Sequence, residues 1–265
     1  MPAATVGELR QSDVDEQIRQ LERRLAAEQE LVPASVLHDC VRRAWARFSG
    51  AKVRAYIPIL VERRVRAELR SSPGSRSLVE WSRGTAERLL AGALPRRWAH
   101  TQGVAGQAAA IGWVLPEGER DVLVAAAWLH DIGYADGLVR TGMHQIDGAL
   151  FLREHGVEER ICALVAQHAG ASAVAELQGL SAELAQFPDE RGPVRDALWY
   201  SDMTTSPVGE PVSFDERMAE LRQRRGPEDP VVRALAINGE ERAAAVRRTQ
   251  ELLERKAALR SLAAG

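Results

Sequence analysis

The chain has 265 residues, of which 45% are hydrophobic and 27% charged, so it can bury one large core or a main domain with a smaller one attached. Its formal net charge of −2 provides no strong field for nucleic acid or an anionic membrane, and we expect neither as a partner. The longest apolar run, 122–129, is far shorter than the ~20 residues of a membrane helix. With two isolated cysteines and no signal-peptide pattern, we expect a soluble, cytoplasmic protein.

The first third of the chain shows three apolar stripes at helical spacing, which begin near Val14, Val36 and Val53. We therefore expect a three-helix unit over residues 1–70, followed by a Ser/Pro/Gly-rich linker at 71–77. Three short amphipathic helices bury little area alone. This unit is therefore expected either to pack on the main domain or to associate with its own copy.

Helical spacing continues to the C-terminus without any alternating β-type run, so the expected fold class is all-α. Gly133 falls where a glycine that ends a helix belongs, and Ser213 with Glu216 fits a capping box. The expected helices span residues 78–92, 96–112, 118–131, 145–155, 158–169, 174–186, 193–203, 213–225, 229–237 and 239–262.

Several histidines and aspartates lie on the apolar faces of these helices or at their ends. His100, for example, shares a stripe with Val104 and Ala108, whereas His38 and His155 lie among charged neighbours and are expected in solvent. The polar residues expected to point inward are His100, His130, Asp131, His144, His168 and Asp202.

Six inward polar groups need a common explanation. One such histidine is usually a hydrogen-bonded core residue. Each unpaired group would cost roughly 1–3 kcal/mol, which six groups could not sustain against a total stability of about 5–15 kcal/mol. A divalent cation removes the problem, because it balances the carboxylates and binds neutral imidazoles.

The types of ligand restrict the metal. Four histidines and two aspartates without cysteine form a nitrogen and oxygen set, and six ligands exceed what one structural zinc ion needs. The set fits two ions that share a bridging carboxylate. Fe, Mn, Ni or Co suit it better than Mg does.

Five stretches carry a family resemblance: RRWAHTQGVA, AAWLHDIGY, TGMHQIDGALFL, LVAQHAG and LWYSDMTT. Their order resembles the HD-domain superfamily of metal-dependent phosphohydrolases over residues 78–206, with residues 207–265 as a C-terminal helical extension. The resemblance implies a helical core in which His100, His130, Asp131 and Asp202 bind a first metal. His144 and His168 resemble the extra histidines of the dinuclear branch, which bind a second metal with Asp131 bridging.

Two further comparisons with known families refine this expectation. Cyclic-dinucleotide phosphodiesterases carry a GYP signature and a lysine after the HDIG segment, whereas this chain has Tyr134 there and no GYP. This difference argues against cyclic-dinucleotide hydrolysis. In the N-terminal third, AKVRAYIPILVERRVRAEL resembles a small actinobacterial three-helix bundle proposed to dimerise, which favours a homodimer through residues 1–70.

The resemblance implies hydrolysis of a phosphoester or phosphoanhydride, in a nucleotide or dinucleotide, by a metal-bridging hydroxide, with Asp131 and Asp202 as catalytic residues. Two alternatives stay open: a diiron oxygenase, and a regulatory or binding module with a vestigial site. The basic run RQRR at 222–225 is interpreted as a solvated helix end. Candidate substrate contacts, chosen because they lie near a ligand in sequence, are Arg96, Arg97, Tyr134, Arg140, Thr204 and Thr205.

Overall fold

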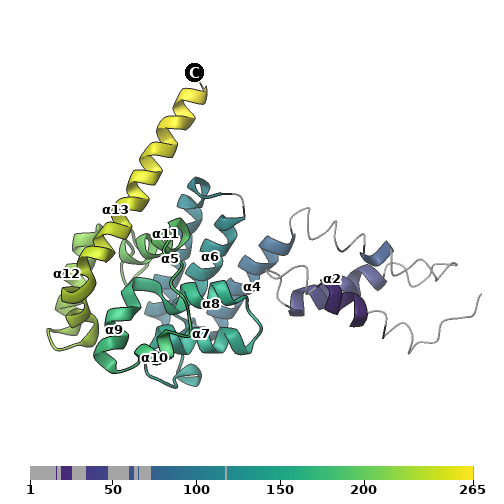
Figure 1. The fold of residues 1–265 in the computed structure, drawn as a ribbon, viewed down its shortest axis with the longest axis horizontal. Coiled ribbons are helices and arrows are strands. Elements are labelled where there is room, and N and C mark those ends of the chain that lie inside the picture. Colours follow the sequence, from purple (N-terminus) through teal and green to yellow (C-terminus); the bar gives the residue numbers. More distant parts are fainter. Residues whose placement is uncertain are drawn as a thin grey trace, which may run out of the picture. The chain divides into compact units, whose positions relative to one another are not determined.

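The structure is a computed structural model, and the fold is all-α (Figure 1). The residues it describes are 16, 19–25, 34–46, 60–62, 65, 73–116 and 118–264. Within these ranges the only extended pairing is an isolated bridge between Thr205 and Pro211. No helix in the described part of the chain is both long and apolar enough to cross a membrane. The chain divides into two compact units, Met1–Leu78 and Val79–Gly265, which we describe separately.

The first unit contains α2 (Ala34–Ala46) and a small apolar core. This core joins residues from all three predicted stripes: Leu21, Leu25, Leu37, Val41, Ala44, Val61 and Val65. Most of the motif at 51–69 lies outside the described residues, as do the stripe positions Val14 and Val53. The three-helix bundle therefore stays a prediction.

α4 (Pro73–Leu90) begins inside the stretch that the sequence indicates as a linker at 71–77. Proline suits the first turn of a helix, because its missing N–H would have no partner there and its φ is already helical. The Ser/Pro/Gly composition of this stretch thus marks the start of a helix from residue 73 onward.

Three helices form the centre of the second unit: α5 (Pro95–Ile111), α6 (Glu119–Leu129) and α11 (Pro193–Met203). The apolar run at 122–127 of α6 is buried throughout, which explains why this helix lacks a polar face. Trp98 of α5 stacks on Trp128 of α6, with ring centroids 5.6 Å apart. All three helices begin and end within two residues of their predicted limits, which is the usual uncertainty of helix ends.

α7 (His144–Glu154) packs on α8 (Glu159–Ala166) and on the short turn η3 (Ile132–Tyr134) that follows α6. Gly133 does not end α6 as predicted, because the helix stops four residues earlier and Gly133 lies inside η3. A Cβ at Gly133 would lie 1.9 Å from the His144 carbonyl oxygen. Glycine is needed here so that the start of α7 can touch the turn that carries Asp131.

The region predicted as one helix at 174–186 consists of two, α9 (Ala171–Gln178) and α10 (Ser181–Leu184). Gly179 separates them with a φ of 72°, a left-handed conformation that glycine adopts without strain. The remaining short turns of this unit are η2 (Gly112–Val114), η4 (Asp136–Leu138) and η5 (His168–Gly170).

The C-terminal segment consists of α12 (Phe214–Arg225) and α13 (Pro230–Ala264). The predicted capping box at Ser213 and Glu216 is present at the start of α12. α13 covers both helices predicted at 229–237 and 239–262, and its backbone is non-helical at Asn238. A shared apolar cluster holds α12 and α13 against α11: Trp199, Met203, Met218, Leu221, Leu235, Ala245 and Val246.

Candidate metal centre

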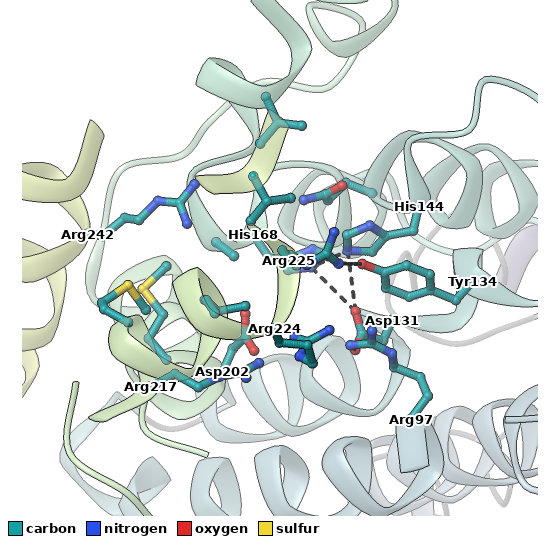
Figure 2. A pocket seen from close by; sticks show the side chains of 17 residues that line it. Arg97, Asp131, Tyr134, His144, His168, Asp202, Arg217, Arg224, Arg225 and Arg242 are labelled. Carbon is teal, nitrogen blue, oxygen red and sulfur yellow. Dashed lines mark hydrogen bonds and ion pairs between the residues drawn. The ribbon is translucent and has the colours of Figure 1, made fainter. Parts of the chain in front are cut away.

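Five elements of the second unit bring the six predicted side chains together. α5 carries His100 in its first half, α7 begins with His144, and η5 begins with His168. His130 and Asp131 follow the last residue of α6, and Asp202 lies in the last turn of α11. Figure 2 shows Asp131, His144, His168 and Asp202 around one hollow. All six are buried except His144, whose side chain is 14% exposed.

His100, His130 and Asp202 form a first group, in which one potential ligand atom of each lies within 4.8 Å of the others. His100 Nε2 lies 3.0 Å from Asp202 Oδ1. His100 Nδ1 faces the Ser206 carbonyl oxygen at 3.0 Å, and a carbonyl oxygen only accepts, so Nδ1 carries the proton. The Nε2 lone pair therefore faces a carboxylate oxygen, an arrangement that needs a proton or a cation between the two atoms.

Asp131, His144 and His168 form a second group with the same spacing of ligand atoms. The Nε2 atoms of His144 and His168 lie 3.2 Å apart. Asp131 Oδ1 is 3.3 Å from His144 Nε2 and 3.9 Å from His168 Nε2. Three potential donors therefore converge on a point beside Asp131.

Asp131 belongs to the second group and also faces the first, through its other carboxylate oxygen. While Oδ1 faces the second group, Oδ2 lies 3.3 Å from His130 Nε2 and 3.9 Å from His100 Nε2. Arg97 donates a hydrogen bond to the same Oδ2 over 2.7 Å. A carboxylate with one oxygen toward each set of imidazoles has the position required of a bridge between two cations.

Backbone carbonyls orient three of the four imidazoles. The Nδ1 atoms of His100, His130 and His168 face the carbonyl oxygens of Ser206, Ala127 and Val165. This contact fixes the tautomer in which Nε2 has a free lone pair, as is usual for metal-binding histidines. The exception, His144, is positioned by a ring stack on Tyr134, with centroids 3.9 Å apart.

The charges of the site favour carboxylates and, in the second group, neutral imidazoles. Burial alone would raise the pKa of Asp131, but Arg97 and His130 hold it well below its usual range. Burial also lowers the pKa of His144, and it lowers that of His168 to about 4. His130 differs, because the nearby Asp131 and Asp202 outweigh the effect of burial and raise its pKa.

The six residues fit a pair of divalent cations. His130 Nε2 is fully buried and has no hydrogen-bond partner in the described part of the chain, although it points at the carboxylates. Leaving such an atom unpaired costs roughly 1–3 kcal/mol, and a cation between the carboxylates would satisfy it. Imidazole nitrogens with carboxylate oxygens are the donor set of Fe, Mn, Ni or Co.

A cavity of about 60 Å³ opens beside Asp131, His144, His168 and Asp202 (Figure 2). Five arginines line it, of which only Arg97 was among the predicted substrate contacts. The other four come from α12 and α13: Arg217, Arg224, Arg225 and Arg242. The run at 222–225 is thus more than a solvated helix end, since two of its arginines reach the cavity.

A second, larger hollow of about 380 Å³ adjoins this cavity. Arg97, Arg217 and Arg224 line both of them. The rest of the larger hollow is mainly apolar and is formed by the turn before α5, the first half of α5 and the loop after α11: Ala93, Leu94, Pro95, Arg96, His100 and Pro207. We call it the apolar groove.

The predicted substrate contacts lie in different places. Tyr134 lines the cavity, and its hydroxyl accepts a hydrogen bond from Arg225 over 3.3 Å, while Arg96 lies in the apolar groove. Arg140 does not reach either hollow, because it is half exposed and pairs with Glu154.

Thr204 and Thr205 were also predicted as substrate contacts. Their hydroxyls donate to the carbonyl oxygens of Tyr200 and Ser201, so both side chains are bound to the last turn of α11. Neither threonine lines the cavity or the apolar groove. Their hydroxyls thus serve the end of a helix in this structure.

Comparison with known proteins identifies one family model. The model of the HD domain matches residues 97–205, which contain all six side chains of the two groups. No curated protein and no solved structure gives a significant match to the chain.

Proposed function

Starting from the HD domain at residues 97–205, we propose that this protein is a metal-dependent phosphohydrolase that cleaves a phosphoester or phosphoanhydride. The observation that carries the proposal is the position of Asp131, whose Oδ2 faces His130 of the first group while its Oδ1 faces His144 of the second. His100, His130 and Asp202 would hold one cation, and His144 with His168 would hold the other. Asp131 would hold both.

Two divalent cations in these groups would supply a water whose pKa falls towards ~7 and would offset negative charge on the phosphoryl oxygens. Side chains of the protein would orient the metal ligands and the attacking water. Arg97 fixes Asp131 through its hydrogen bond to Oδ2, and Tyr134 fixes His144 through the ring stack. Asp202, which lines the cavity, would orient the attacking water. The lining arginines would bind phosphate oxygens.

The two adjoining hollows support an organic phosphate, such as a nucleotide or dinucleotide, as the substrate. The cavity of about 60 Å³ is far smaller than the ~300–1,000 Å³ of sites that enclose whole small molecules. It has room for a phosphate group but not for a nucleoside. The apolar groove offers about 380 Å³ for the organic part, with Arg97, Arg217 and Arg224 between the two spaces.

The test is a metal analysis of the purified protein, followed by a screen for phosphate release. Nucleotides and dinucleoside polyphosphates would be offered to protein reconstituted with Mn²⁺ or Fe²⁺, and oxygen uptake would be recorded in parallel. Phosphate release without oxygen uptake supports the proposal. Iron with oxygen uptake and no phosphate release would identify a diiron oxygenase. Protein that binds no metal and turns over nothing would identify a regulatory module.

We further propose that residues 1–70 bring two copies of the chain together. The small core around Leu25, Val41 and Val61 is the support for a folded unit there. Light scattering of the full chain over a range of concentrations, compared with a chain that starts at residue 71, tests this proposal. A monomer at every concentration would refute it.

A further inference from the structure

Arg242 is a buried charge without an ionic partner among the residues that the structure describes. Only 2% of this residue is exposed, and it forms no ion pair within the described part of the chain. Burial lowers its pKa to about 10, so the guanidinium is still charged at neutral pH. An unpaired buried charge is strongly unfavourable. Because Arg242 lines the cavity beside the candidate metal centre, an anion there would supply the missing partner (Figure 2).

The surroundings of Arg242 hold its guanidinium in one position. Its Nε donates to Asn238 Oδ1 over 2.7 Å, and Asn238 Nδ2 donates to the Gly170 carbonyl oxygen over 2.7 Å. A Cβ at Gly170 would lie 2.7 Å from Arg242 Nε, so only glycine admits this approach. The helical backbone of α13 is interrupted at Asn238 itself. Three separate features therefore position one arginine at the cavity.

The arginines of α12 add further uncompensated charge. Arg217 and Arg224 both pair with Glu220, so one carboxylate serves two guanidinium groups. Arg225 pairs with Asp229 and leaves its buried Nε without a hydrogen-bond partner. We call Arg217, Arg224, Arg225 and Arg242 the arginine wall. Glu220 and Asp229 are its only ion-pair partners among the described residues, so two of its positive charges lack a counterion.

Asp202 is the remaining negative group near Arg217 and Arg242. Its Oδ1 lies 3.0 Å from His100 Nε2, and under the proposed function it would bind a cation. A cation at Asp202 would leave the arginine wall without any carboxylate to balance its excess. The excess positive charge of the arginine wall would then be balanced by a further negative group of the ligand, in addition to the phosphoryl group that contacts the cations.

We propose that the arginine wall binds a second phosphate group, so that the substrates of this protein are compounds with at least two phosphates. The proposal rests on the proposed function and adds the class of substrate to it. The phosphate that is cleaved would lie against Asp131 and Asp202 with the cations, and its neighbour would lie against Arg242.

The test compares a diphosphonate with a monophosphonate, neither of which is hydrolysed. Full-length protein loaded with Mn²⁺, freed of excess metal, would be titrated calorimetrically with methylenediphosphonate and with methylphosphonate. We expect at least about tenfold tighter binding of the diphosphonate, since hydrogen bonds to charged groups contribute on the order of tenfold or more in affinity. Arg242→Gln is expected to remove most of this preference while metal content stays unchanged, because Arg242 is not among the six candidate metal ligands.

Two further variants make the comparison specific. Arg233→Gln removes an exposed arginine from the same helix and is expected to keep the preference. Arg224→Gln, whose wild-type side chain is 35% exposed, cannot disrupt the core and is expected to reduce the preference severalfold, because Glu220 would then serve Arg217 alone. A diphosphonate preference that survives in both Arg224→Gln and Arg242→Gln would overturn the proposal, as would its absence from the wild type.

The same variants can be measured without metal, which separates this proposal from the proposed function. In chelator-treated, dialysed protein we expect inorganic phosphate to bind the wild type about tenfold more tightly than Arg242→Gln, because the arginine wall needs no metal. If the protein proves to hold no metal, the phosphohydrolase proposal fails while this measurement still decides the anion site. Equal phosphate affinity in both proteins would refute the site.

Discussion

Arg97 donates to Asp131 Oδ2 over 2.7 Å, and the same oxygen faces the imidazoles of His100 and His130. The arginine therefore sets the angle of the carboxylate that both groups share, and its guanidinium also lies 4.0 Å from the centre of the Tyr134 ring. Changes to such supporting contacts typically lower metal affinity or activity by about 10–100-fold.

Arg97→Gln is accordingly expected to lower turnover of a phosphorylated substrate by about 10–100-fold, while metal content at saturating Mn²⁺ stays near that of the wild type. The measurement is kcat with metal content determined on the same sample. Arg140→Gln, which removes a half-exposed arginine bound to Glu154, serves as the control and should leave both quantities unchanged. Full activity in Arg97→Gln would contradict the positioning role.

His130→Ala is expected to weaken metal binding at the first group strongly. The fully buried Nε2 of His130 has no other partner in the described residues, so its loss removes a ligand and leaves nothing to replace it. We expect metal affinity to fall by at least about 100-fold, since even supporting residues contribute up to that amount. Metal content by atomic emission checks this, with the exposed His155→Ala as control. Retention of metal and turnover in His130→Ala would show that the site is assigned wrongly.

Tyr134 offers a test that separates its ring from its hydroxyl. Tyr134→Phe keeps the stack on His144 and removes the hydrogen bond from Arg225. We expect it to bind both metals normally, whereas Tyr134→Ala should lower affinity for the second metal by about tenfold because His144 loses its support. Calorimetric titration with Mn²⁺ distinguishes the two variants. Equal Mn²⁺ affinities of Tyr134→Phe and Tyr134→Ala would mean that the Tyr134 ring does not position His144.

Under the proposed function, acidification should release the metal of the first group at a higher pH than the metal of the second group. The pKa of His130 is raised by Asp131 and Asp202, so protons compete with metal at the first group at a higher pH. Burial lowers the pKa of His168 to about 4 and that of His144 well below its ordinary value, so the second group resists protonation.

Dialysis of the metal-loaded protein at stepwise lower pH should therefore release one equivalent before the other, because bound metal requires unprotonated ligands. The first loss should begin as the pH falls through the ordinary range of histidine, ~6.5, and the second should occur closer to pH 4. In His144→Ala the acid-resistant equivalent should be missing. Simultaneous loss of both metals would argue against two separable sites.

The six inward polar residues could be predicted because each lies on or beside an apolar stripe of its own helix. His100 with Val104 and Ala108 is one example, and all three are buried. The arginine wall could not be predicted in this way. Helical periodicity shows which face of a helix is buried, but it does not show which other element lies opposite. Arg224 and Arg225 end a helix in a basic run that would look the same in solvent.

Arg242 illustrates the limit most clearly. In the sequence it is one of many charges in a long polar helix, yet it has one of the largest fully buried side chains in the described part of the chain. Its burial depends on the close approach of Gly170, which is 72 residues away in the chain. A contact of that kind follows from tertiary packing, and neither propensity nor periodicity encodes it.

The position of the arginine wall in the chain has a consequence for how such a protein can diversify. All six side chains of the candidate metal centre lie within residues 97–205, whereas every arginine of the wall lies after them. If the two proposals hold, the residues that carry the reaction and those that select the substrate occupy consecutive stretches of the chain. Under the two proposals, exchange of the C-terminal stretch would change the molecule bound beside the same candidate metal centre, and a fragment trimmed to residues 97–205 would lose the arginine wall.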